Sequence, residues 1–208
     1  MRKALLTAGA VRVLVLSDTH GDHKKFRSLP PADIFLHAGD FTRYGAGAEE
    51  FAVWFHKLPY RVKLLTLGNH EGKDAVQKYR PERWRALFGP LLLLDRGARV
   101  SANGRDVVVL GLPHATALAK IPEGVDIVLS HEPPHRILDA TYGGGHAGSE
   151  TIARLVRDCD APVHAFGHVH ARGGESERHG SVTHVNAATR AVLFELRDRA
   201  ARVLELYP

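Results

Sequence analysis

The sequence predicts an α/β protein in which two mixed β-sheets pack face to face, with helices on their outer sides. Three patterns along the 208 residues lead to this prediction. Short apolar runs alternate with helix-length segments in the first half of the chain, which is typical of parallel strands joined by helices. Further apolar runs return in the second half. Strand–turn–strand patterns lie in the middle and at the C-terminus, and their combination with parallel units favours two packed sheets.

Five continuous apolar runs have the pattern of strands that are buried on both faces. We expect strands over residues 11–16, 33–37, 62–67, 126–129 and 163–166. Each run ends on a polar motif. Because open α/β sheets bind ligands at the carboxyl ends of their strands, these motifs are expected to gather at one edge.

Three segments have helical spacing of apolar residues and recognisable ends. The first ends before Pro59, the second begins with Pro81, and the third begins at Ser149, which suits an N-cap. The expected helices cover residues 48–58, 81–88 and 149–159.

Antiparallel pairs are expected in the middle and at the end of the chain. Asn103-Gly104 lies between strand-like residues 99–101 and 106–110, and Asn-Gly in that setting is a strong hairpin signal. The C-terminus has a similar pattern, which predicts three strands joined by short turns over residues 182–186, 191–196 and 202–207. The sequence has no repeat, low-complexity tract or linker, so residues 1–208 are expected to form a single domain.

Composition places the chain among ordinary globular proteins, with 44% apolar and 25% charged residues. The formal charge of +5 comes from scattered basic residues, which favours anionic substrates weakly and gives poor support for nucleic-acid binding. Cys159 is the only cysteine, which excludes an internal disulfide and fits a cytoplasmic protein. Arg12 interrupts the N-terminal apolar stretch, so no secretory signal is expected, and no apolar run is long enough to predict a membrane span.

Polar residues that suit metal coordination follow the predicted strands. Asp18 and His20 would face the same way in an extended chain, and Gly39 would allow a tight turn before Asp40. His70 is an acid–base candidate beside these ligands. The other candidate ligands are Asn69, His131, His168 and His170. Carboxylate and amide oxygens and imidazole nitrogens bind divalent ions, so motifs of this kind at five strand ends predict one metal site.

The ordered series Asp-x-His, Gly-Asp, Gly-Asn-His-Glu, His and Gly-His-x-His resembles the calcineurin-like metallophosphoesterases, and it runs from Asp18 to His170. Segments 17–20, 37–42, 130–134 and 166–170 are similar to the small metallophosphoesterase-domain phosphodiesterases of the 239AB type. This resemblance implies the calcineurin-like phosphoesterase fold, a four-layer αββα sandwich of two mixed β-sheets flanked by helices.

The resemblance also implies a dinuclear metal centre in which Asp40 bridges two divalent ions. Each ion would have three further ligands, which are Asp18, His20 and His170 for one ion and Asn69, His131 and His168 for the other. Manganese is favoured, and Fe, Zn, Ni or Co are alternatives that these ligand types admit.

The implied reaction is hydrolysis of a phosphoric ester, with a phosphodiester favoured. A hydroxide that bridges the ions would attack phosphorus in line, and His70 would lie near the leaving group. In several relatives an acidic residue three positions after the bridging Asp orients the catalytic His. This chain has Arg43 there, so the residue that orients His70 is not predicted. Arg43 and Asn186 are candidate substrate contacts.

Other functions stay open at this point. The same site would serve a phosphomonoesterase or a nuclease. A non-catalytic binding scaffold is disfavoured because all candidate ligands and His70 are present, and a metal-dependent amidohydrolase would open on His-x-His instead. The expected partner is a small phosphoester, with nucleotides among the options. Neither the physiological substrate nor the oligomeric state is predicted.

Overall fold

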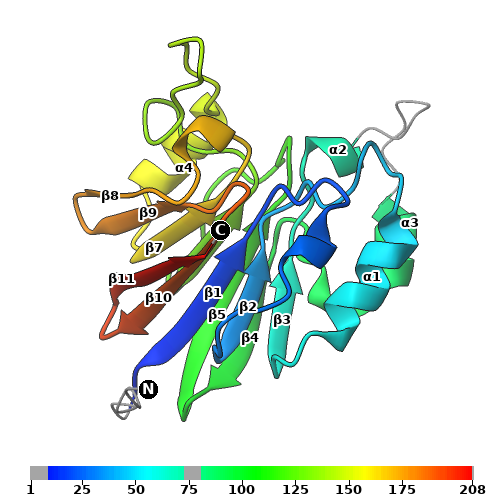
Figure 1. Ribbon diagram of the computed structural model, residues 1–208. Coiled ribbons are helices and arrows are strands. Elements are labelled where there is room, and N and C mark those ends of the chain that lie inside the picture. Colours follow the sequence, from blue (N-terminus) through cyan, green and yellow to red (C-terminus); the bar gives the residue numbers. More distant parts are fainter. Residues whose placement is uncertain (1–8, 73–80, 208) are drawn as a thin grey trace.

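The predicted fold is confirmed: two mixed sheets lie face to face and helices cover their outer faces (Figure 1). The computed structural model describes residues 9–72 and 81–207. All the strands and helices predicted above are present in these residues. Residues 1–8, part of the N-terminal stretch considered for a secretory signal, lie outside the described residues.

The first sheet has the strand order β11-β10-β1-β2-β3. β1, β2 and β3 run parallel, whereas β10 pairs antiparallel with both β1 and β11. Along β1, Val13 and Val15 pack toward the second sheet, and Leu14 and Leu16 pack toward the helices. The strands are β1 Val11–Leu16, β2 Ile34–His37, β3 Val62–Leu65, β10 Ala191–Arg197 and β11 Ala200–Tyr207.

The second sheet has the strand order β4-β5-β6-β7-β9-β8. Its central strands are parallel, and β4 and β8 are antiparallel edge strands. β4 and β5 form the predicted hairpin, and Asn103 and Gly104 in its turn have φ of 47° and 75°. The strands are β4 Arg96–Ala102, β5 Arg105–Leu112, β6 Ile127–Ser130, β7 Val163–Phe166, β8 Ser176–His179 and β9 Val182–Asn186.

The helices cover the outer face of each sheet with apolar side chains. Phe51 and Phe55 of α1 and Trp84 of α3 pack on the first sheet, and Ile152 and Leu155 of α4 pack on the second. The helices are α1 Ala48–Lys57, α2 Asn69–Gly72, α3 Pro81–Phe88 and α4 Glu150–Arg157, with 3-10 turns η1 His23–Lys25, η2 Gly89–Leu91 and η3 His170–Arg172. The Ser149 side chain accepts the Ile152 N–H at 3.3 Å, which confirms the predicted N-cap.

The C-terminal strands differ from the predicted arrangement. β9 pairs with β7 in the second sheet, and β10 pairs with β1 in the first, so the chain crosses between sheets at residues 187–190 instead of turning back on itself. β8 was not predicted, because its Ser-Glu-Arg-His sequence is exposed along its length and has no apolar pattern. The described residues form no helix long and apolar enough to span a membrane.

Candidate metal centre

The polar motifs at the strand ends come together, as expected, at the edge where the parallel strands of both sheets end (Figure 1). The loops after β1, β2, β3, β6 and β7 carry, in that order, Asp18, Asp40, Asn69, His131 and His168. Hydrogen bonds between loops fix this arrangement, since the loop after β7 places the His168 N–H 2.8 Å from Asp18 Oδ2. The site therefore draws on both sheets.

The backbone that presents these residues is left-handed. Asp18, His20, Asp40 and His168 have φ of 57°, 44°, 53° and 68°. Such values are uncommon for residues other than glycine and occur often at functional sites. Backbone hydrogen bonds from Asp18 N to Gly39 O and from His20 N to Asp40 O, each 3.0 Å, hold two of these residues. The expectation that Asp18 and His20 share one face of an extended chain is therefore wrong, because a turn brings them together.

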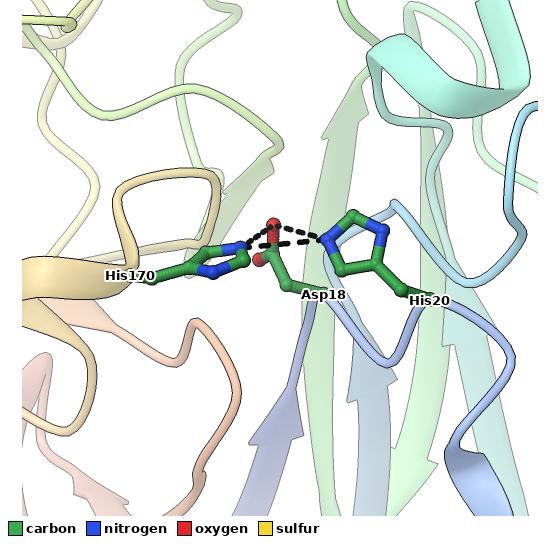
Figure 2. Close-up of side chains that lie close together, drawn as sticks. All are labelled: Asp18, His20 and His170. Carbon is green, nitrogen blue, oxygen red and sulfur yellow. Dashed lines mark hydrogen bonds and ion pairs between the residues drawn. The ribbon is translucent and has the colours of Figure 1, made fainter.

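Asp18, His20 and His170 form the first candidate ligand group, and Figure 2 shows their side chains pointing toward one another. His170 Nε2 lies 3.3 Å from Asp18 Oδ1 and 3.4 Å from His20 Nε2. His20 Nε2 lies 3.8 Å from the same carboxylate oxygen. Ligand atoms around one ion are about 3 to 3.5 Å apart when each bond is about 2.1 Å long. This group therefore has the spacing of a single cation site with little adjustment.

Asp40, His131 and His168 form the second candidate group, and Asn69 lies beside it. His131 Nε2 lies 3.5 Å from Asp40 Oδ2 and 2.9 Å from Asn69 Oδ1. The other ring nitrogen, Nδ1, lies 2.9 Å from the Ala38 carbonyl oxygen, which sets the ring so that Nε2 faces the group. His168 and His170 thus serve different groups, although a single face was expected for them in an extended chain.

The chemistry of the second group fits a cation. Asp40 Oδ2, Asn69 Oδ1 and His131 Nε2 carry lone pairs, and in a neutral His131 none of these atoms has a hydrogen to donate to the others. Burial lowers the pKa of His131, but the Asp40 carboxylate outweighs it and raises the pKa to about 10. The group therefore stabilises positive charge strongly, and a divalent ion would supply that charge.

Asp40 lies where the two groups adjoin. Its Oδ2 atom is 4.0 Å from His20 Nε2 and 3.5 Å from His131 Nε2. Burial raises the pKa of this carboxyl, yet the His131 charge and the hydrogen bonds from His131 and His70 lower it below its usual range. A buried carboxylate that stays ionised between two imidazole groups fits the predicted bridging ligand.

His70 lies in the short helix α2, which begins at Asn69, and it faces Asp40. Its backbone N–H donates to Asp40 Oδ1 at 2.8 Å, and its Nε2 lies 3.8 Å from Asp40 Oδ2. Among the described residues, its buried Nδ1 atom has no hydrogen-bond partner. The ring therefore lies beside both candidate groups, and no side-chain hydrogen bond within the described residues fixes its orientation.

The two candidate substrate residues differ in position. Arg43 is exposed at the edge of the site, where its Nε donates to the His20 carbonyl at 2.6 Å and its terminal nitrogen lies 3.2 Å from Asp22. Asn186 is fully buried, and its amide donates to the carbonyls of Leu138 and Val169 at 3.2 and 3.0 Å. Its expected contact with substrate is wrong, because its side chain holds the backbone beside His168 and His170 instead.

A cavity of about 640 Å³ opens over several of the candidate ligands and His70. It is lined by His20, Asp40, Arg43, Tyr44, Asn69, His70, His168 and His170. A smaller cavity of about 240 Å³ shares His168 and His170 as lining residues and extends along Tyr142. Two cavities therefore lie against these imidazoles.

Two residues of the site had no assigned role in the sequence reasoning. Glu71 is buried and accepts hydrogen bonds from the backbone N–H groups of Asp40, Thr42 and Gly68 at 2.7, 2.9 and 3.0 Å. It joins the loops after β2 and β3, and its place in the Gly-Asn-His-Glu motif was the available signal. Tyr44 stacks on the His70 ring, and a lone tyrosine in a loop gives no comparable signal.

Comparisons with known protein families agree with this geometry. The family model described as calcineurin-like phosphoesterase matches residues 11–172. Metallophosphoesterase domain-containing protein 1 of Homo sapiens is 31% identical over 90% of this chain and 68% of that protein. A UPF0046 protein of Caenorhabditis elegans is 28% identical over 86% of this chain and 69% of its own length.

Solved structures share the fold at low sequence identity. TT1561 of Thermus thermophilus has a TM-score of 0.63 and 16% identity, over 94% of this chain and 99% of that chain. A Staphylococcus aureus protein named as a candidate 5′-nucleotidase has a TM-score of 0.60 and 14% identity, over 96% of this chain and 54% of that chain. At these identities the likeness concerns the fold alone.

Proposed function

This chain belongs to the calcineurin-like phosphoesterase family, and we propose that it hydrolyses a phosphoric diester with two divalent metal ions. The observation that carries the proposal is the convergence of lone-pair atoms on Asp40, whose Oδ2 lies 3.5 Å from His131 Nε2 and 4.0 Å from His20 Nε2. Such a set needs cations to balance it, and a phosphate group is the anion that those cations would attract.

The proposed ligand sets follow the two groups. Asp40 would be common to both ions, with Asp18, His20 and His170 completing one set and Asn69, His131 and His168 completing the other. When bound, the ions would supply Lewis-acid stabilisation of phosphoryl charge and a nucleophile at neutral pH. Mn²⁺ is our preferred metal, and Fe, Zn, Ni and Co suit the same mixed oxygen and nitrogen ligands.

His70 is the proposed acid at the leaving group. Its ring lines the larger cavity, and its backbone is tied to Asp40 by the 2.8 Å hydrogen bond, so it is held beside the position of the phosphate. A positioned imidazole donates a proton to the departing oxygen and lowers the barrier to its release. Arg43, exposed at the edge of the same cavity, has further N–H groups with which it would contact the substrate.

The two cavities support a diester over a monoester. Both are lined by His168 and His170, with volumes of about 640 and 240 Å³. A diester carries a substituent on each side of the phosphorus, and the two cavities offer space for both. These volumes suit a small phosphoester, a nucleotide included. We further propose that residues 1–208 form a single domain, which binds this substrate.

A substrate panel tests the proposal. Hydrolysis of bis(4-nitrophenyl) phosphate, 4-nitrophenyl phosphate, 2′,3′-cyclic AMP and single-stranded DNA would be compared at saturating Mn²⁺. We expect the nitrophenyl diester or the cyclic nucleotide to have the highest kcat/KM. A higher value for the monoester would overturn the diester assignment, and a higher value for DNA would identify a nuclease.

Two variants accompany the panel. His70→Ala is expected to lower kcat on the best substrate by about a hundredfold or more. His56→Ala, on the exposed side of α1, is the control and is expected to keep the full rate. Equal rates for both variants would remove His70 from the reaction.

A further inference from the structure

Tyr44 lies flat against the imidazole of His70. The two ring centroids are 4.0 Å apart and the planes differ by 16°, so the rings are stacked. The His20 ring also contacts His70, with centroids 4.5 Å apart and planes tilted by 58°. The imidazole therefore contacts two other rings, and stacking of this kind favours a particular ring orientation.

The backbone of Tyr44 is held in an unusual conformation. Its φ is 52°, in the left-handed region that aromatic residues rarely adopt. Arg43 and Ala46 close a two-residue turn around it, with backbone hydrogen bonds of 3.2 and 3.1 Å in the two directions. The Gly45 N–H donates to Thr42 Oγ1 at 3.0 Å. The turn thus holds the backbone from which the tyrosine ring projects, although the residue is 61% exposed.

Two further contacts anchor this turn to the rest of the protein. Arg83 donates to the Gly45 carbonyl at 3.1 Å, and Glu71 accepts a hydrogen bond from the Thr42 hydroxyl at 2.7 Å. Glu71 belongs to α2, the helix that begins beside His70. The elements that carry the two stacked rings are therefore connected through Thr42 and Glu71. These hydrogen bonds restrain the backbone segments from which both rings project.

No side-chain hydrogen bond among the described residues orients the His70 ring. Its Nδ1 atom is buried without a partner, and its Nε2 lies 3.8 Å from Asp40 Oδ2. The nearby Arg43 guanidinium donates to the His20 carbonyl and to Asp22, so it does not orient the His70 ring. We propose that Tyr44 is a positioning residue for His70, whose stacked ring holds the imidazole with Nε2 toward Asp40 and the cavity.

This inference rests on the proposed role of His70 in phosphoester hydrolysis. Removal of the tyrosine ring would let the imidazole rotate about its side-chain bonds, so a smaller fraction of molecules would present Nε2 to the leaving oxygen. The loss would affect the chemical step and leave substrate affinity nearly unchanged. Because the stack needs the ring and not the hydroxyl, Tyr44→Phe would retain the function.

A double-mutant cycle in kcat tests the positioning role. Tyr44→Ala is expected to lower kcat on bis(4-nitrophenyl) phosphate by about tenfold or more, with KM unchanged within about twofold. Tyr44→Phe is expected to match the wild type. In a His70→Ala background, Tyr44→Ala is expected to cause no further loss, because it acts through a group that is no longer there. An equal loss in both backgrounds, or an inactive Tyr44→Phe, would show that Tyr44 acts on the substrate directly and would overturn the inference.

A measurement on metal-free protein separates this inference from the proposed function. Protons above an aromatic face are shielded, so Tyr44→Ala is expected to move the NMR resonances of the His70 ring protons downfield, while Tyr44→Phe leaves them nearly in place. Unchanged resonances in Tyr44→Ala would show that the rings do not stack and would overturn the inference. A fully active His70→Ala with shifted Tyr44→Ala resonances would instead contradict the catalytic role proposed for His70, while the stacking of the two rings would stand.

Discussion

The carboxylate of Glu71 accepts a hydrogen bond from the backbone N–H of Asp40 at 2.7 Å. The same oxygen accepts the Gly68 N–H at 3.0 Å, and the second oxygen accepts the Thr42 N–H and hydroxyl at 2.9 and 2.7 Å. One buried side chain therefore joins the loop that carries Asp40, the proposed bridging ligand, to the loop that carries Asn69 and His70. This contact holds the backbone of the two loops that carry these proposed site residues.

Glu71→Gln is predicted to destabilise the protein, although the two side chains have nearly the same shape. The glutamine amide would direct N–H groups at backbone N–H donors, so at least one buried polar group would lose its partner. The expected cost is about 1 to 3 kcal/mol of unfolding free energy. Urea denaturation measures it, with Glu123→Gln at an exposed position as the control. Equal midpoints for the two variants would contradict the role given to Glu71.

Gly39→Ala is predicted to damage the same junction through steric clash. A Cβ atom at Gly39 would lie 2.4 Å from the Gly68 backbone nitrogen, and φ at Gly39 is +97°. Gly104 is a matched control, because its φ is +75° but a Cβ there meets no atom within 4 Å. We expect Gly104→Ala to cost about 1 kcal/mol from backbone strain, and Gly39→Ala to cost clearly more and to weaken Mn²⁺ binding.

Denaturant midpoints and Mn²⁺ titration calorimetry compare the two glycine variants. If Gly39→Ala loses no more stability than Gly104→Ala and binds Mn²⁺ like the wild type, the close approach of the two loops is needed neither for stability nor for metal binding.

His184, which lies outside the candidate metal centre, is predicted to make stability fall in acid. Its side chain contacts His164, with Nδ1 atoms 3.2 Å apart, and faces His179 and Glu177. Burial and then the His179 charge lower the pKa of His184 to about 4, against the opposing Glu177 charge. Between about pH 6.5 and pH 4 the unfolded chain binds a proton that the folded chain does not. Stability therefore declines as pH falls through that window, by roughly 3 kcal/mol at most.

His184→Asn tests this effect, since asparagine keeps a hydrogen-bonding group near His164 and does not titrate. The difference in unfolding free energy between pH 7.5 and pH 5 is expected to be smaller in this variant than in the wild type. His56→Asn, at an exposed position, is expected to keep the wild-type difference. The same pH dependence in all three proteins would rule out His184 as the cause.

Most strands and helices could be predicted because their sequences carry local signals. The Asn103-Gly104 turn and the Ser149 cap fix backbone conformations through a few neighbouring atoms. The edge strand Ser176–His179 carries no such signal, since it is exposed and pairs only with Val182–Asn186. The crossing between sheets depends on which strand each C-terminal strand pairs with. This pairing is decided by tertiary contacts, which the spacing of apolar residues along the chain does not reveal.

In the candidate site too, the sequence indicated which residues take part but not the geometry in which they lie. Ligand types at strand ends indicated Asp18, Asp40 and His168, but not the positive φ that presents them, because hydrogen bonds between distant loops impose that backbone. Asn186 has ligand-type chemistry, yet its burial turns it into a support for the backbone at Val169. Hydrogen-bond partners such as the Val169 carbonyl depend on how the loops pack in the folded protein, so the sequence alone does not predict them.

One titration tests the central proposal most directly. Mn²⁺ would be added to chelator-stripped protein while bound Mn²⁺ per chain and hydrolysis of bis(4-nitrophenyl) phosphate are followed together. We predict no hydrolysis without metal, a rate that rises with bound metal and saturates at two ions per chain, and loss of both binding and rate in Asp40→Ala. Full hydrolysis by the stripped protein in excess chelator would contradict metal-dependent catalysis at this site.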